Sequence, residues 1–157
     1  IIADFDKVDE SNLNRQQYFV DQLGMPKVEA MTENLRRINP NVKIEGHQIK
    51  LTADNVLKIF GEADVIAECF DKAEEKQMLV ETVLSKMPDV IVVSASGLAG
   101  YGNSNAIQTR RVSKRFILVG DCKSGIDSVK ILTAARVGIA ACHQANAIIE
   151  VLMNGVI

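Results

Sequence analysis

Acidic residues follow two of the apolar runs in this chain, where they could do chemistry at the edge of a sheet. Asp4 and Asp6 come directly after the run at residues 1–3, and Asp71 follows the run at residues 64–69. In open α/β sheets the ligand site lies outside the carboxyl ends of the strands. An acid there can accept hydrogen bonds from the ribose of a nucleotide, or hold Mg²⁺ beside phosphate oxygens. Acids at strand ends are also common as solvated turn residues, so both interpretations stay open.

Amide and guanidinium groups are crowded into the segment that follows the first run. Asn12, Arg15 and Gln16 lie in an expected loop, where an arginine can grip phosphate oxygens through its fork and amides can add neutral donors. Lys27 falls in the first turn of the next expected helix, where the helix dipole favours negative charge. A phosphate beside the lysine would make that placement favourable. The alternative is an exposed lysine that tolerates a small dipole cost.

Apolar residues at strand and helix spacing indicate the elements that must position these side chains. Continuous Val and Ile runs are typical of buried strands, and apolar residues that recur along one face are typical of helices. We expect strands at residues 1–3, 64–69 and 89–95, a β-rich stretch at 42–51 with Gly46 as a possible bulge, and a hairpin of 106–111 and 115–119. We expect helices at residues 26–38, 55–60, 73–86 and 133–153, the last closed by Asn154 and Gly155. The alternation predicts an α/β fold, a Rossmann-like and mostly parallel sheet with helices on both faces and a C-terminal antiparallel extension.

The composition is that of a globular protein and argues against several classes of function. The chain has 157 residues, with 18 Lys and Arg against 20 Asp and Glu, which leaves a net charge of −2. Nucleic-acid-binding domains carry a basic excess and often an aromatic stacking platform, whereas this chain has five Phe, two Tyr and no Trp. No apolar run approaches the roughly 20 residues of a membrane span. We therefore expect neither a nucleic-acid nor a membrane partner.

The three cysteines are far apart and include no CxxC pair, which argues against a disulfide framework and favours a reducing cytoplasm. Cys69 and Cys142 have apolar neighbours and are expected in the core. Cys122 lies in an expected loop and is either a catalytic thiol or, as we favour, an exposed bystander. The basic cluster at residues 110–115 would either meet an acidic face of a partner or form a solvated hairpin tip.

Two long, ordered motifs make the chain similar to one known family. The run DFDKVDESNLNRQ at residues 4–16, followed by GMPK at 24–27, resembles the D-x-D-x-V-x-x-S-N-L-x-R-Q … G-x-x-K signature of the ThiF/MoeB superfamily, the ATP-dependent activators of ubiquitin-like proteins. Residues 35–40 resemble the R-I-N-P helix end of that family, and residues 68–71 occupy the place of its acid after the fourth strand. The resemblance extends over the whole chain. The segments that look most like the ThiF-type proteins of thiamine biosynthesis are residues 12–19, 95–102 and 143–146.

The resemblance implies an adenylyltransferase. Such enzymes bind ATP and Mg²⁺ together with a small ubiquitin-fold sulfur carrier protein, here one like ThiS. They join AMP to the carboxylate of the carrier's C-terminal Gly-Gly and release pyrophosphate. By position Asp71 would bind the Mg²⁺ and serve as a catalytic residue. The fold is usually a symmetric dimer, so the resemblance also implies a homodimer.

The other residues that match the family's pattern would surround the nucleotide. Asp4 would hold the ribose, and Gln16 would support the nucleotide pocket. Asn12, Arg15 and Lys27 would contact the phosphates. Arg15 and Lys27 would also be catalytic, because the barrier lies in charge on the α-phosphate and the departing pyrophosphate, which cations stabilise.

The chain departs from the family pattern in two respects. The Gly-rich ATP loop G-x-G-G-x-G, which belongs to a strand–helix unit ahead of residues 1–3, does not occur in it. We therefore expect residues 1–157 to form one ThiF-like domain that lacks its first strand–helix unit and binds nucleotide poorly. Gly97, Gly100 and Gly102 follow a late strand, and we expect them to be turn glycines. The two CxxC pairs of the family's zinc site are also missing, so we expect no structural zinc.

Three alternatives stay open. A non-catalytic partner subunit of an activating-enzyme heterodimer would keep the fold and lose nucleotide-binding residues, whereas Arg15, Lys27 and Asp71 are all present. A MoeB-like activator in molybdopterin biosynthesis would act on a different carrier. A nucleotide-binding oxidoreductase would share the Rossmann-like sheet, but hydride transfer has no need of a cluster such as Asn12, Arg15 and Lys27.

Overall fold

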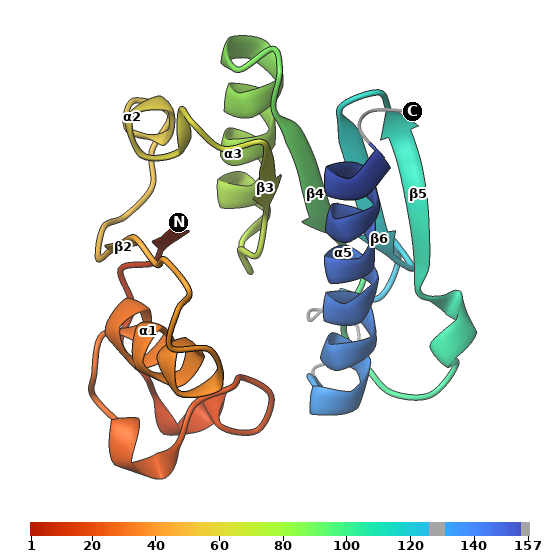
Figure 1. The fold of residues 1–157 in the computed structure, drawn as a ribbon. Coiled ribbons are helices and arrows are strands. Elements are labelled where there is room, and N and C mark those ends of the chain that lie inside the picture. The colour runs from red at the N-terminus through yellow and green to blue at the C-terminus, as the bar shows by residue number, and fades with distance from the viewer. Residues whose placement is uncertain (126–130, 155–157) are drawn as a thin grey trace. The chain divides into compact units, whose positions relative to one another are not determined.

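The chain forms two compact units, Ile1–Leu51 and Thr52–Ile157, and each is described by itself. The computed structural model describes residues 1–125 and 131–154 (Figure 1). None of the described helices has the length and apolar composition that a membrane crossing requires.

The first unit combines a short parallel strand pair with one long helix. Strand β1 (Ile2–Ala3) is half-buried and pairs with β2 (Gly46–His47). Helix α1 (Lys27–Ile38) begins directly after Pro26, and its buried residues are Val28, Ala30 and Asn34. Two 3₁₀ helices, η1 (Glu10–Asn12) and η2 (Val20–Gln22), lie between β1 and α1 along the chain.

The prediction for this unit is confirmed for the helix and wrong for the stretch at residues 42–51. Only the two residues of β2 form a strand there. Gly46 is not a bulge, because it pairs in regular parallel register with Ile2. A Cβ at Gly46 would lie 2.5 Å from Cγ1 of Val28, so the glycine lets β2 lie close against α1.

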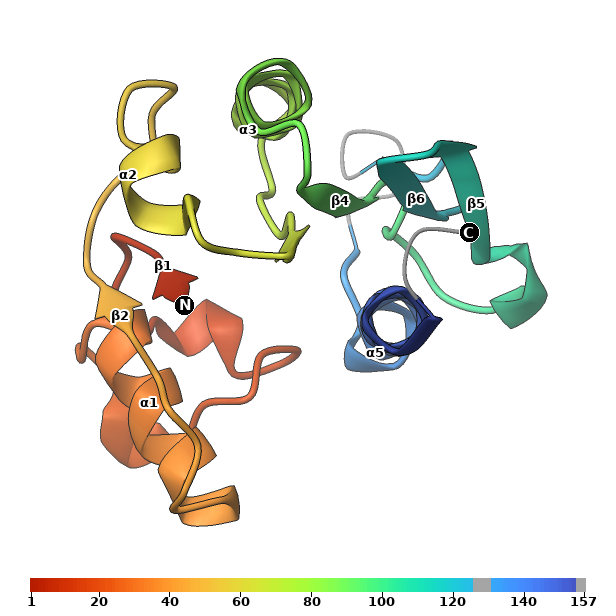
Figure 2. The same cartoon turned by 45° about the horizontal axis from the view of Figure 1, so that its top comes forward.

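The second unit is a four-stranded sheet with a helix on each face. The strand order is β3 (Val65–Ala67), β4 (Ile91–Ala95), β6 (Phe116–Gly120), β5 (Gln108–Ser113). The first three of these are parallel, and β5 runs antiparallel to β6. Helices α3 (Ala73–Lys86) and α5 (Ala134–Asn154) lie on opposite faces of this sheet (Figure 2), and α2 (Val56–Phe60) precedes β3 along the chain. The predicted Rossmann-like α/β arrangement with an antiparallel extension is confirmed.

The core of the second unit lies where α5 packs on the sheet. All five residues of β4 are buried, because this strand has neighbours on both sides and helices on both faces. The buried apolar cluster consists of Ile91, Val93, Ile107, Ile117, Val119, Ala140, Ala147 and Val151. Burial on both faces explains why the strand is a continuous apolar run in the sequence.

Three details of the second unit differ from the prediction. The hairpin is displaced, because residues 104–106 form the 3₁₀ helix η3 (Ser104–Ala106) and β5 extends to Ser113. The basic cluster is not a free tip: Arg115 donates to the carbonyl oxygens of Leu84, at 2.6 Å, and Met87, at 2.9 Å. Strand β5 itself is an edge strand whose six residues are all exposed. The expected closing residue Gly155 lies outside the described residues.

Candidate functional site

Lys27 is held where two segments of the first unit run side by side. The Val8 N–H donates to the Met25 carbonyl at 2.8 Å, and the Lys27 N–H donates to the Asp6 carbonyl at 2.9 Å. The Lys27 ammonium then lies 2.8 Å from Oδ2 of Asp6, with only 11% of the lysine side chain exposed. The expected place in the first turn of α1 is confirmed, but the dipole cost is offset by a carboxylate of the chain itself. An ammonium has three N–H donors, so the pair leaves donors for a further acceptor.

Two acids and a tyrosine surround this lysine. Asp4 is half-buried and accepts the Asp6 N–H at 2.8 Å through Oδ1, which leaves Oδ2 for a hydroxyl donor. The Tyr18 hydroxyl lies 3.5 Å from the Lys27 carbonyl oxygen. Burial, together with the negative charges of Asp4 and Asp6, raises the pKa of Tyr18 to about 12. Tyr18 is therefore a neutral hydroxyl beside two carboxylates at physiological pH.

The segment expected to be a loop contains the 3₁₀ helix η1, which is capped by the side chains of Asp9 and Asn12. The Asp9 N–H donates to Oδ1 of Asn12 at 3.0 Å, and the Ser11 N–H donates to Oδ1 of Asp9 at 2.9 Å. Hydrogen bonds from the side chain and from the N–H of Ser11 lower the pKa of Asp9. Asn12 is buried, so its carbonyl oxygen is committed to capping the helix.

Arg15 stands directly after η1 with part of its guanidinium in use. Its Nη1 donates to the Ser11 carbonyl at 2.7 Å and to Oδ1 of Asn14 at 2.8 Å. Both contacts fix the side chain and leave Nη2 and Nε for another acceptor. The half-buried Gln16 follows, and its N–H donates to the Asn12 carbonyl at 2.8 Å. The first unit thus carries cationic donors at Arg15 and Lys27 and free acceptor oxygen at Asp4, which are the group types that a nucleotide requires.

Asp71 belongs to the second unit, in the turn between β3 and α3. Its side chain is exposed and makes no hydrogen bond or ion pair with any residue that the structure describes. Glu68, which lies three positions before Asp71, was not predicted to be a site residue. It is completely buried and is bonded to three elements of the unit, β4, α3 and α5. In the sequence, Glu68 is an acid within the apolar run at residues 64–69, and a charged residue in such a run is expected to have a buried partner.

A metal ion at Asp71 would depend on ligands from outside the chain. Among the described residues, no three His, Cys, Asp or Glu side chains come together as a metal site. Mg²⁺ is commonly held by one or two carboxylates, with phosphate oxygens and water as its other ligands. The exposed Asp71 carboxylate can serve as one protein ligand of such an ion, so its chemistry fits Mg²⁺.

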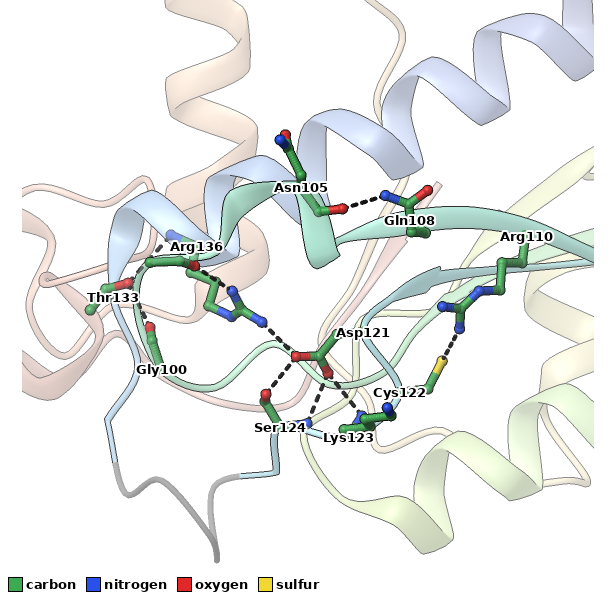
Figure 3. A network of polar contacts seen from close by, with 11 residues as sticks. Gly100, Asn105, Gln108, Arg110, Asp121, Cys122, Lys123, Ser124, Thr133 and Arg136 are labelled. Atoms are coloured by element: carbon green, nitrogen blue, oxygen red, sulfur yellow. Dashed lines mark hydrogen bonds and ion pairs between the residues drawn. The ribbon is translucent and has the colours of Figure 1, made fainter.

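A second polar network lies at the carboxyl ends of β4 and β6 (Figure 3). Asp121 accepts from Nη2 of Arg136 at 2.6 Å, from the N–H groups of Lys123 and Ser124 at 2.8 Å each, and from the Ser124 hydroxyl at 2.5 Å. Desolvation raises the pKa of Asp121, but the hydrogen bonds from Ser124 and Lys123 and the charge of Arg136 outweigh it and lower the pKa to about 2. Arg136 also donates to the Gly102 carbonyl at 2.8 Å. The network therefore joins α5 to the loop after β4 and to the loop after β6.

The loop after β4 and the segment at the end of β6 approach each other so closely that there is no room for a Cβ at either of two glycines. A Cβ at Gly97 would collide with Oδ1 of Asp121, and one at Gly120 would collide with the Ser96 carbonyl oxygen. Both glycines have positive φ, at 77° and 130°. Gly97, Gly100 and Gly102 all have the positive φ that is expected of turn glycines, and Gly100 also forms an isolated parallel bridge with Leu132.

The prediction that Cys69 and Cys142 belong to the core is wrong, because all three cysteines are exposed and none forms a disulfide. Cys69 lies in the turn after β3, and Cys142 is on a side of α5 that faces away from the sheet core. Desolvation of the thiol and the charge of Glu68 raise the pKa of Cys69, which makes it a poor nucleophile. Cys122 is exposed and accepts from Nη1 of Arg110 at 3.2 Å.

A comparison with protein families decides the relationship. The family model described as the ThiF family matches residues 1–155. The chain belongs to the ThiF family. The resemblance seen in the sequence is therefore confirmed at the level of the superfamily of ubiquitin-like protein activators.

Curated relatives of this ThiF-family chain are longer proteins. The adenylyltransferase and sulfurtransferase UBA4 of Candida glabrata is 33% identical over 102 residues, 64% of this chain and 23% of that protein. The adenylyltransferase and sulfurtransferase uba4 of Pyricularia oryzae is 32% identical over 123 residues, 77% of this chain and 24% of that protein. Ubiquitin-like modifier-activating enzyme 5 of Drosophila willistoni is 36% identical over 91 residues, 50% of this chain and 22% of that protein. The chain thus spans about a quarter of the length of these relatives.

Solved structures show the same fold. The E. coli tRNA N6-threonylcarbamoyladenosine dehydratase TcdA, in complex with ATP, superposes with a TM-score of 0.76 at 18% identity, covering 98% of this chain and 76% of that one. The same protein in complex with AMP gives a TM-score of 0.75 at 20% identity, covering 94% and 74%. These likenesses establish the α/β architecture of the ThiF-family chain.

Proposed function

We propose that this ThiF-family chain serves in the ATP-dependent adenylylation of the C-terminal Gly-Gly carboxylate of a small ubiquitin-fold sulfur carrier protein. The carrier is ThiS-like, and the pathway is thiamine (thiazole) biosynthesis. The protein acts in the cytoplasm as a homodimer. It uses ATP and Mg²⁺ and needs no structural zinc.

The observation that carries the proposal is the state of Arg15 and Lys27 in the first unit. Each cation is fixed by one set of contacts and keeps N–H donors for another acceptor. A half-buried ammonium beside a single carboxylate is a suitable partner for a phosphate, which is more highly charged than a carboxylate. The relatives include adenylyltransferases and a modifier-activating enzyme, which supports the same chemistry.

The reaction needs charge stabilisation and positioning more than proton transfer. A carboxylate oxygen of the carrier attacks the α-phosphorus of ATP, and the bond from that phosphorus to the oxygen bridging to the β-phosphate breaks. The products are an acyl-adenylate and pyrophosphate. The attacking carboxylate is already ionised, so no general base is required. Asn12, Arg15 and Lys27 would contact the phosphates, and the two cations would stabilise the charge that develops there. Asp4 would hold the ribose, and Gln16 would support the nucleotide pocket.

Asp71 would hold the Mg²⁺ that accompanies ATP. The ion would supply positive charge to the phosphates when bound. Asp71 contributes an oxygen ligand that is exposed and engaged by no described residue. Its role as a ligand rests on the family resemblance and on the chemistry of a free carboxylate.

The test is exchange of labelled pyrophosphate into ATP by the full-length protein. We expect exchange with a ThiS-like carrier that ends in Gly-Gly and none with the same carrier shortened by its last glycine. Exchange only with a carrier of molybdopterin biosynthesis would move the protein to the MoeB-like alternative. No exchange with any carrier, together with tight binding to a second activating-enzyme subunit, would make it a non-catalytic partner.

A further inference from the structure

Among the described residues of the second unit, Glu68 is the one acid that is completely buried, and the proposed chemistry does not use it directly. The side chain is completely buried directly after β3. Oε2 accepts the Ser94 hydroxyl of β4 at 2.5 Å, and the Lys76 ammonium of α3 lies 3.0 Å from Oε1 and 3.1 Å from Oε2. A buried carboxylate is stable only with such partners, because leaving water costs an ion several kcal/mol.

The backbone of Glu68 is fixed as firmly as its side chain. Its N–H donates to the Val93 carbonyl at 2.9 Å, and its carbonyl accepts from Nε2 of Gln144 at 3.1 Å. The same Gln144 nitrogen donates to the Val93 carbonyl at 3.2 Å, so α5 is bonded both to the residue after β3 and to the middle of β4. Glu68 is therefore a rigid point at the carboxyl end of the sheet.

The turn that carries Asp71 is bonded to this rigid point on both sides. Before Asp71, the Phe70 N–H donates to Oε1 of Glu68 at 2.6 Å. After Asp71, the first turns of α3 carry Lys76, which binds the same carboxylate. Asp71 itself contacts no described polar group, so its direction is determined by the backbone on either side. The buried carboxylate thus holds the backbone from which the Asp71 side chain projects.

We propose that Glu68 is a positioning residue that aims the Asp71 carboxylate at a divalent cation bound with nucleotide. The inference rests on the proposed role of Asp71 in holding Mg²⁺. Glu68 touches neither the ion nor the nucleotide and acts through the Phe70 N–H and the Lys76 ammonium. Support of this kind behind a ligand commonly changes metal affinity by about 10–100-fold.

The experiment makes two measurements on the full-length protein. Mn²⁺ binding with saturating ATP is followed by the electron paramagnetic resonance signal of free Mn²⁺. ATP binding without metal is measured by calorimetry in EDTA. The test variant is Glu68→Met with Lys76→Met, which removes both charges with little change in volume and preserves folding better than removing one partner. We expect at least about tenfold weaker Mn²⁺ binding and an unchanged metal-free affinity for ATP. Glu68→Gln keeps an acceptor for the Phe70 N–H and should recover most of the Mn²⁺ affinity. Asp89→Asn, an exposed acid before β4 at the opposite end of the sheet, is the matched control and should bind Mn²⁺ normally.

Several outcomes would overturn the inference. Normal Mn²⁺ binding by the double variant would remove Glu68 from any positioning role, and an equal loss of ATP affinity in EDTA would show a general effect on the fold. If Glu68→Gln failed to recover the Mn²⁺ affinity, the hydrogen bond to the Phe70 N–H would not be the contact through which Glu68 positions Asp71. The Asp71→Asn variant distinguishes failure of the proposed magnesium site from failure of the inference about Glu68. Normal Mn²⁺ binding by that variant would refute both. Weakened binding by Asp71→Asn with normal binding by the double variant would refute the inference alone.

Discussion

The ammonium of Lys27 lies 2.8 Å from the carboxylate of Asp6, which is 21 positions away in the sequence. The pair forms because residues 6–8 and 24–27 run side by side, linked by backbone hydrogen bonds. The acid holds a cation in the first turn of α1, a place that the helix dipole makes unfavourable. The lysine is thus positioned before any phosphate arrives.

Replacing this lysine should weaken ATP binding while leaving the fold in place. A charge-assisted hydrogen bond contributes about 1.5–3 kcal/mol, so Lys27→Met should lower ATP affinity by about tenfold or more in calorimetry. Asp6→Asn keeps the ammonium and should have a smaller effect. Lys43→Met, at an exposed position of the same unit, is the control and should bind ATP like the unaltered protein. Equal affinities for the Lys27 and Lys43 variants would remove Lys27 from the phosphate site.

Loss of the Asp71 carboxylate should abolish the proposed reaction. We expect Asp71→Ala to show no carrier-dependent exchange of pyrophosphate into ATP, because Mg²⁺ would lose its protein ligand. The variant should unfold at an unchanged temperature, since the side chain is exposed and unbonded to described residues. Asp89→Ala should exchange normally. Exchange by Asp71→Ala at the unaltered rate would take Asp71 out of the mechanism.

The Asp121–Arg136 pair should be a major contributor to stability in the second unit. Only 6% of the arginine side chain and 12% of the aspartate side chain are exposed. Asp121→Asn leaves a buried guanidinium without its counter-charge, which should lower the free energy of unfolding by about 3 kcal/mol. Urea unfolding followed by circular dichroism measures the change. The exposed Asp89→Asn should change stability by less than about 0.5 kcal/mol, as surface substitutions usually do.

The same pair should make stability depend on pH in the acid range. The folded pKa of Asp121, about 2, is below its ordinary value of 3.8. A depressed carboxyl pKa gives stability that is complete above the ordinary value and is lost as the pH falls from about 4 through about 2. The urea midpoint of the unaltered protein should therefore fall towards that of Asp121→Asn between pH 5 and pH 2. A constant difference between the two proteins over that range would contradict the assignment.

Two glycines should respond in opposite directions to the same substitution. Gly120→Ala would place a methyl group against the Ser96 carbonyl at a φ of 130°, so we expect a loss of several kcal/mol or failure to fold. Gly138 lies in α5 with nothing within 4 Å of a Cβ, and Gly138→Ala should stabilise the chain by about 1 kcal/mol. Thermal unfolding of the two variants tests both signs in one experiment.

Elements with strong local patterns could be predicted from the sequence. Helix α3 spans the residues expected for it, because helical spacing and helix ends are encoded within the segment itself. The stretch at residues 42–51 has β-forming residues, but a strand needs a partner, and β1 supplies only two paired residues. The hairpin was displaced for a similar reason, since its register depends on pairing with β6 and on an irregularity between Arg111 and Ser113.

Only part of the candidate site could be predicted, because a family motif identifies residues in the sequence but not the residues that they contact in the fold. Arg15, Lys27 and Asp71 could be named from the motifs, whereas the Asp6 partner of Lys27 depends on a chain reversal. Arg136 could also have been predicted from the sequence, because it lies at four-residue spacing from Ala140 and Gln144 and shares the buried side of α5 with them. A charged residue on the apolar side of a helix requires a buried partner, which here is Asp121.

Strand β5 affects how the folded chain behaves when it is concentrated. Along its outer side it has no partner among the described strands, and a row of unpaired backbone groups is a template for another strand. Arg110 and Arg111 lie on this strand, so two copies that approached edge to edge would bring like charges together. The arginines therefore protect the chain against aggregation through its own sheet.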